Sequence, residues 1–297
     1  MNTPKKLLIL AALSCACAWL NAAEKITLAG SDLIKPCIAD AAKSIAAKNG
    51  IELEVDMEGT FAAYDKLNSG KADIAIIALP RTRELPEGLV ALPFAYQAAV
   101  VIVNSVNPIE EISTAQLSDI YSIATPNRAE TWNQIGVKNI GLRNIMPIMT
   151  NLSDNVVVEL FKYTAIDGMN LGQWVHIADN KTTIYNLIKA NNSAIAVIGK
   201  HSERGESLVK VVSVAKSDKN GKKTYAFRPD RENIFNGDYP LTLPFYVVFK
   251  KENSDKIKGV ARILLGDDIA QKIDKSDFFS APSSSRKKSI FDLDSPR

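Results

Sequence analysis

Short polar side chains stand where predicted strands end and predicted helices begin, and these residues could bind a small solute. Hydroxyl groups and helix-terminal N–H groups donate hydrogen bonds to anions, and the dipole of a helix favours negative charge at its N-terminus. Carboxylates at the same places would instead suit a neutral or cationic solute. The candidate ligand-binding residues are Ser31, Asp32, Thr60, Ser153, Asp154 and Asn155.

Each candidate also fits a purely structural role. Ser and Thr are favoured helix caps with or without a ligand, and an Asp near a helix start commonly interacts with the helix dipole. The carboxylates of Asp32 and Asp154 could also fill an anion site from within the protein. The residue types alone leave these alternatives open.

The residue types and their spacing give little support for catalysis or for metal binding. The two histidines, His176 and His201, lie 25 positions apart and have no cysteine or carboxylate cluster at ligand spacing, so we expect neither a metal nor a cofactor. Ser31 and Ser153 lack the Gly-x-Ser-x-Gly motif of a serine hydrolase, and neither histidine stands in a triad context. We therefore expect a binding protein, not an enzyme.

Strands and helices alternate through the first third of the chain. Gly and Pro punctuate this pattern, which predicts a parallel sheet with right-handed crossovers. Ligands bind at the carboxyl ends of the strands in such sheets, here at the turns near Gly30, Gly59 and Pro80. The predicted elements are strands at 24–29, 51–57 and 72–79 and helices at 36–48 and 61–69.

Two long apolar runs, at residues 93–107 and 241–250, bracket the middle of the chain. We interpret residues 98–103 as a central strand buried on both faces and the two runs as crossovers between two lobes. This predicts an α/β clamshell with lobe 1 at 24–100 and 244–282 and lobe 2 at 101–243.

The middle segment repeats the strand and helix pattern less regularly, and a final helix at 257–265 extends toward 273. We expect an irregular link at 228–239 and a disordered tail at 283–297, because the tail is rich in Ser and charge. Other predicted elements are helices at 114–121, 156–163 and 182–190, strands at 145–149 and 194–198, and a hairpin turn at 216–223.

The N-terminus predicts export. Lys5 and Lys6 precede an apolar stretch at 7–20 that ends in small residues, which is typical of a secretory signal peptide at 1–23 and implies a periplasmic mature chain. Cys37 is then the one remaining cysteine, so no internal disulfide is expected; the helix start could lower its pKa, unless it is a buried, inert thiol. A net charge of +3 gives no indication of a nucleic-acid partner.

The order of motifs resembles the phosphate-binding proteins of bacterial phosphate ABC transporters. The similarity runs over most of residues 25–280. The segments that carry it are 30–36 (GSDLIKP), 72–74 (ADI), 103–108 (VNSVNP), 117–121 (LSDIY) and 131–136 (TWNQIG).

The resemblance implies a periplasmic-binding-protein fold, a phosphate-like oxyanion as ligand and a membrane permease as partner. Five positions depart from it: Met149 stands where the family has an Arg, Ala78 where it has an Asp, Asp154 where it has a Gly, and Leu33 and Ile34 where it has hydroxyls. Because the bidentate guanidinium is a strong contact to an oxyanion, we expect weak phosphate binding.

Two expectations follow from these departures. Replacing Met149 by Arg together with Asp154 by Gly should restore some anion binding, because a bidentate partner would be added at a vacant helix N-terminus. The alternative function is a ligand-free adaptor or sensor in the cell envelope that uses the same fold.

Overall fold

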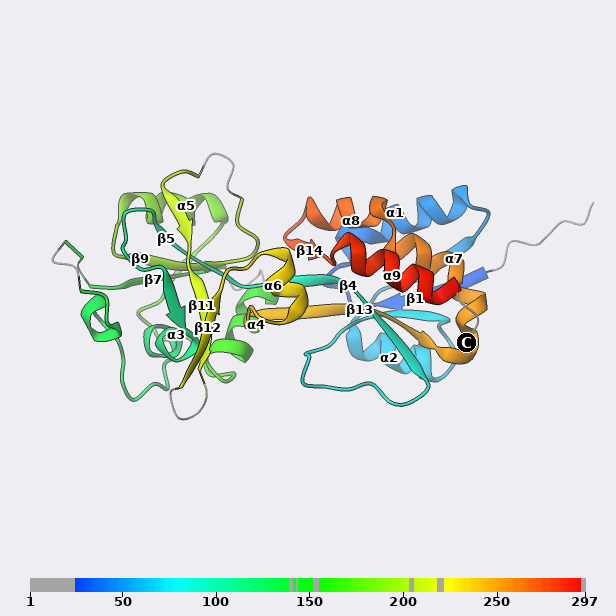
Figure 1. Ribbon diagram of the computed structural model, residues 1–297, viewed down its shortest axis with the longest axis horizontal. Coiled ribbons are helices and arrows are strands. Elements are labelled where there is room, and N and C mark those ends of the chain that lie inside the picture. Colours follow the sequence, from blue (N-terminus) through cyan, green and yellow to red (C-terminus); the bar gives the residue numbers. More distant parts are fainter. Residues whose placement is uncertain are drawn as a thin grey trace, which may run out of the picture.

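A computed structural model describes residues 25–138, 141–142, 144–151, 155–202, 206–217 and 222–294. The predicted signal peptide lies outside these residues. Figure 1 shows two α/β lobes side by side, with the middle of the chain in one and both ends of the described chain in the other.

The first lobe is built on a six-stranded sheet in the order β14-β4-β13-β3-β1-β2. β1 runs parallel to both β2 and β3, as the alternating pattern predicts, whereas β13 runs antiparallel to β3 and β4. The strands are β1 (Lys25–Gly30), β2 (Glu52–Asp56), β3 (Ile74–Ala78), β4 (Leu89–Ala98), β13 (Thr242–Lys250) and β14 (Phe278–Ser280).

Helices cover both faces of this sheet. Ile74 and Ile76 of β3 pack into the cluster formed with α1, α7 and α8, whereas Ala75 and Ile77 pack toward α2, as the two-residue period of a strand requires. The helices are α1 (Lys35–Lys48), α2 (Thr60–Asn68), α7 (Ser254–Leu265), α8 (Asp267–Asp274) and the short η2 (Lys251–Asn253).

The second lobe has a five-stranded sheet in the order β10-β5-β9-β7-β8 and a three-stranded sheet in the order β12-β11-β6. One buried apolar cluster unites its sheets with α3, α4 and α5. Its elements are β5 (Val100–Asn104), β6 (Glu111–Ser113), α3 (Thr114–Tyr121), η1 (Trp132–Ile135), β7 (Met146–Thr150), α4 (Asn155–Ala165), β8 (His176–Ala178), α5 (Lys181–Ala190), β9 (Ala194–Ile198), β10 (Val209–Val211), β11 (Ser213–Ser217) and β12 (Lys223–Phe227).

The two lobes are joined at two adjacent crossovers. Ala99 separates β4 from β5, and its N–H donates to the carbonyl of Leu241 just before β13 (3.0 Å). The buried Tyr239 hydroxyl donates to the carbonyl of Ala99 (2.8 Å). The prediction of a two-lobed α/β clamshell is confirmed, but the single central strand expected at 98–103 is wrong, because the chain changes sheets at Ala99.

The expectation of a disordered tail is also wrong. Residues Ser283–Asp294 form helix α9, which packs on α7 in the first lobe (Figure 1). Ile290 and Leu293 contact the apolar cluster of this lobe, and Asp294 binds Arg262 of α7. Tertiary contacts therefore order a segment whose own composition does not. The link expected to be irregular also contains a helix, α6 (Arg231–Asn236).

Arg286 fixes α9 to the lobe and is only 6% exposed. Its guanidinium donates to the carbonyls of Ala281 (3.0 Å) and Leu265 (2.6 Å) and to the carboxylate of Asp267 (2.8 Å). The hydrogen bond from Arg286 is the main cause of the lowered pKa of Asp267.

Replacing Arg286 by Met should lower the free energy of unfolding by about 3 kcal/mol, because two buried carbonyls lose their donors along with a charged hydrogen bond. The exposed neighbour Lys287 is the control, and Lys287→Met should change stability by less than about 0.5 kcal/mol. Urea denaturation monitored by circular dichroism measures both. Similar small losses in the two variants would contradict the anchoring role of Arg286.

Candidate ligand-binding cleft

The carboxyl ends of the strands in the two lobes face each other. Ala78 at the end of β3 pairs with Phe245, close to the start of β13 after one crossover. Ile198 at the end of β9 pairs with Val100, the first residue of β5 after the other crossover. The loops that follow the parallel strands of each sheet therefore line the junction between the lobes, which we call the cleft.

Ser31 lies at the end of β1 on the first-lobe side of this cleft. Its N–H donates to the carbonyl of Ile76 (2.8 Å), which fixes the loop to β3. The residue is 1% exposed, and its hydroxyl has no hydrogen-bond partner within the described part of the chain. Buried polar groups in proteins are nearly always paired, so this hydroxyl is available to a ligand.

Gly59 and Thr60 lie beside Ser31. The N–H of Gly59 donates to the carbonyl of Gly30 (3.0 Å). Gly59 has a φ of 138°, a backbone angle that residues with a Cβ rarely adopt. A Cβ built on Gly59 would lie 4.0 Å from Oδ1 of the exposed Asp32. Thr60 opens α2, and its hydroxyl accepts from the N–H of Ala78 (3.1 Å). The structure therefore brings Ser31, Asp32 and Thr60 together.

The second-lobe candidates are described less fully. Ser153 and Asp154 lie outside the described residues, and so does Arg143. Asn155 is the first residue of α4. This helix packs against β4 and β13, so it lies where the second lobe meets the first.

Met149 lies outside the cleft. It is 0% exposed in β7, between Ile177 of β8 and Val197 of β9, and it belongs to the apolar cluster of the second lobe. The position that the resemblance matches to a ligand-binding Arg is therefore a core position here. The expectation that Met149→Arg would contribute an anion contact is wrong.

Arg81 follows β3 but binds protein oxygens. Its guanidinium donates to the carbonyls of Ile234 (3.0 Å) and Phe235 in the last turn of α6 and lies 5.7 Å from the ring centroid of Tyr96. Burial raises the pKa of Tyr96, and the charge of Arg81 opposes that rise. This contact could not be predicted from sequence, because α6 was not predicted and its residues lie about 150 positions from Arg81.

Two lysines of the second lobe reach the first lobe. The ammonium of Lys181 pairs with the carboxylate of Asp277 and donates to the carbonyl of Lys200 (3.1 Å). The ammonium of Lys200 donates to the carbonyls of Asp274 (2.8 Å) and Phe278 (3.0 Å). Burial lowers the pKa of Lys200, while the nearby Asp274 carboxylate acts in the opposite direction. These contacts tie the end of β9 to the loop before β14.

Cys37 sits near the same loop as a half-buried free thiol. Burial raises its pKa, and a hydrogen bond with Ser276 opposes the rise. A thiol with a raised pKa is a poor nucleophile at neutral pH, so the lowered pKa considered from the helix start is not found.

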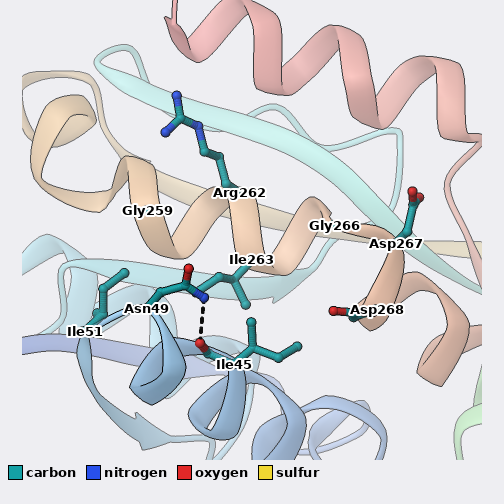
Figure 2. A pocket seen from close by; sticks show the side chains of 9 residues that line it. All are labelled: Ile45, Asn49, Ile51, Gly259, Arg262, Ile263, Gly266, Asp267 and Asp268. Atoms are coloured by element: carbon teal, nitrogen blue, oxygen red, sulfur yellow. Dashed lines mark hydrogen bonds between the residues drawn. The ribbon is translucent and has the colours of Figure 1, made fainter.

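A separate pocket of about 500 Å³ lies between the end of α1 and helices α7 and α8. Figure 2 shows an apolar floor of Ile45, Ile51 and Ile263, with Asp268 at one side and Arg262 turned away from the floor. The Asn49 amide donates to the carbonyl of Ile45 (2.8 Å) (Figure 2). Arg262 is paired with Asp294 of α9, so this pocket offers few free polar groups.

The described residues contain neither a metal-binding cluster nor a membrane-spanning helix. Within the described ranges, no group of three or more His, Cys, Asp or Glu side chains is arranged to hold a metal ion. Among the helices that the structure describes, none has the length and apolar character needed to cross a bilayer.

Comparison with known proteins identifies the superfamily of this chain. A domain model described as the PBP superfamily domain matches residues 18–268. Protein SphX of Synechococcus elongatus is 24% identical over 78% of this chain and 69% of its own length. The resemblance found in the sequence is thus confirmed at the level of superfamily.

Two solved structures share the fold. A possible phosphate binding protein from Planctomyces limnophilus superposes with a TM-score of 0.68 at 17% identity, over 91% of this chain and 97% of its own. PstS from Borrelia burgdorferi superposes with a TM-score of 0.71 at 15% identity, over 87% and 99% of the two chains. At these identities the likeness establishes the fold alone. The ligand has to be inferred from the residues of the cleft.

Proposed function

This chain belongs to the PBP superfamily, and we propose that it is an exported solute-binding protein that closes two lobes over a small ligand. In such a mechanism the closed state is stabilised by contacts that the ligand makes with both lobes. The role is binding, with no chemical conversion of the solute. The predicted signal peptide supports a periplasmic location.

The moving bodies in this proposal are the two lobes. Lobe 1 comprises residues 25–98 and 242–282 together with α9, and lobe 2 comprises the described residues of 100–227, with α6 in the link that follows it. The hinge is the pair of crossovers at Ala99 and Leu241, which are joined by a backbone hydrogen bond. Hinge motions of this kind need only a few residues to change their backbone angles.

The observation that carries the proposal is the buried, unpaired hydroxyl of Ser31 beside Thr60 and Asp32. An unpaired buried hydroxyl costs stability, and residues that weaken the fold are expected at functional sites. Ligand-binding loops at the carboxyl ends of parallel strands are the usual site in sheets of this type. The ligand would be a small polar solute held by loop hydroxyls and N–H groups.

A pair of variants separates binding from folding. Ser31→Ala should leave the free energy of unfolding unchanged or raise it by up to about 1 kcal/mol, because it removes an unpaired hydroxyl. Thr60→Val should lower it by about 1–2 kcal/mol, because the N–H of Ala78 loses its acceptor. Denaturant titrations measure both. Equal losses in the two variants would mean that Ser31 serves the fold alone.

Native mass spectrometry of the exported, mature protein tests the function itself. We expect a bound solute of low mass that is retained by the wild type and lost from Ser31→Ala, with both proteins equally folded by circular dichroism. If the wild type carries no solute, and a panel of small anions, sugars and amino acids produces no compaction in small-angle scattering, the binding proposal fails.

The resemblance and the names of the structural neighbours make a phosphate-like oxyanion the first solute to test. The state of the cations between the lobes indicates that such an oxyanion would bind weakly. Arg81, Lys181 and Lys200 bind protein oxygens, and Asp32 adds negative charge at the strand ends. Delivery to a permease of an ABC transporter is the partner interaction that this function implies.

A ligand-free adaptor or sensor of the cell envelope is the second candidate. The ion pairs between the lobes favour it, since they bridge the lobes with the protein's own charges and need no ligand. A gene for a permease beside this one would favour transport, whereas neighbouring genes for other envelope machinery would favour the adaptor.

A further inference from the structure

Charged residues from the two lobes meet at one side of the junction. Asp274, at the end of α8, and Asp277, in the loop before β14, belong to the first lobe. Lys181 of the second lobe pairs with Asp277, and Lys200 lies 3.8 Å from the carboxylate of Asp274. Arg231 of α6 also binds Asp274 (2.7 Å). Lys181 and Lys200 of the second lobe and Arg231 of the link between the lobes therefore face two carboxylates of the first lobe.

The backbone around Asp277 is shaped for this contact. A Cβ built on Gly199 at the end of β9 would lie 3.4 Å from Oδ2 of Asp277, so the two loops are in close approach. The side-chain amide of Gln97, buried at the end of β4, donates to the carbonyl of Asp277 (3.2 Å). Asp277 is thus held in place by its own lobe while its carboxylate reaches the other.

The contact lies beside the candidate cleft. Ser276 hydrogen-bonds Cys37 in the first turns of α1, and the charge of Asp277 acts on the same thiol. The loop of Ser31 leads directly into this helix. On the second-lobe side, Lys181 begins α5 after the carboxyl end of β8, and Lys200 follows β9. The ion pair therefore spans the rim of the cleft next to α1.

We propose that Asp277 acts as an internal counter-anion: its carboxylate occupies Lys181, holds the lobes together in the absence of solute, and selects against anionic solutes. The proposal deepens the proposed function, because it names a residue that controls access to the same cleft. An anion that needs the ammonium of Lys181 must first displace Asp277. A neutral solute does not need to displace Asp277.

The expected strength suits a reversible contact. The side chains of Lys181 and Asp277 are 29% and 47% exposed, so water and salt screen their attraction. Pairs of this kind shift an equilibrium by about fivefold at most. That is enough to change the fraction of closed molecules and too little to lock the lobes permanently.

Small-angle scattering of the solute-free protein tests the ion pair of Lys181 and Asp277, which we call the clasp, without reference to any ligand. Asp277→Asn should increase the radius of gyration at low salt, and the wild type should approach the variant at about 0.5 M salt, where screening acts within a few ångströms. The charge swap Lys181→Asp with Asp277→Lys should restore the compact form. Asp292→Asn, which breaks a pair within α9, is the matched control and should change nothing.

Calorimetric titration with inorganic phosphate tests the selection. Asp277→Asn should bind phosphate about fivefold more tightly than the wild type, because Lys181 is no longer occupied. Unchanged scattering in Asp277→Asn would overturn the clasp. Weaker, equal or undetectable phosphate binding by this variant would overturn the selection against anions. Failure of every solute to bind, with the scattering change intact, would count against the proposed function and leave the clasp standing.

Discussion

Replacing Met149 by Arg should lower the free energy of unfolding by at least about 4 kcal/mol and should not create an anion site. Met149 is completely buried between β8 and β9, so its replacement would place an unpaired guanidinium in the core of the second lobe. Transfer of a charge from water into such an environment costs several kcal/mol unless it is paired.

Met149→Leu is the matched control for this variant. It conserves volume and apolar character, so its cost should stay below about 1.5 kcal/mol. Urea denaturation of both variants gives the comparison. A stable Met149→Arg protein that binds phosphate more tightly than the wild type would show that the side chain reaches the cleft, against its position in the structure.

The same residue shows what the sequence can and cannot predict. Periodicity correctly predicted β7, because a buried strand needs only a run of apolar residues. Matching a position to a family motif does not determine on which face of the strand its side chain lies. A shift of one residue reverses that face, so an ungapped match can place a core residue in a binding site.

The two apolar runs predicted two crossovers between two lobes, but they did not predict the change of sheet within the first run. Residues 93–104 are almost continuously apolar, and nothing in them distinguishes β4 from β5. The break at Ala99 follows from hydrogen bonds to Leu241 and Tyr239, which lie more than 100 positions away in sequence.

The prediction of a disordered tail was wrong for a related reason. Composition describes what a segment can bury on its own, and residues 283–294 have few apolar side chains. Arg286 orders them by binding Leu265, Asp267 and Ala281, contacts that depend on α7 and α8 being in place. A buried Arg in a polar tail has no local signature in the sequence.

The candidate site was predicted in part. Strand ends drew attention to Ser31, Asp32 and Thr60, and the structure places these three together because parallel strands end at one edge of their sheet. The clasp of Lys181 and Asp277 could not be foreseen, since 96 positions separate the two residues and each looks like an ordinary surface charge.

The second prediction with a large effect is that this protein binds inorganic phosphate weakly. A doubly charged oxyanion loses several kcal/mol of hydration per charge on leaving water, which fixed donors and a cation must replace. Ser31, Thr60 and loop N–H groups would contribute about 0.5–3 kcal/mol each, while Asp32 opposes them. Arg81, Lys181 and Lys200 are committed to protein oxygens. Dissociation constants of about 1 mM or weaker are therefore expected, which corresponds to a binding free energy of only about 4 kcal/mol.

Isothermal titration calorimetry of the mature protein with inorganic phosphate near neutral pH tests this account most directly. Sodium sulfate at matched ionic strength controls for general salt effects, since exposed ion pairs respond to both salts. The cleft described above predicts no saturable heat below millimolar phosphate. Saturable binding in the micromolar range, lost in Ser31→Ala, would contradict it and would mean that an interlobe cation leaves its protein partner to bind the anion.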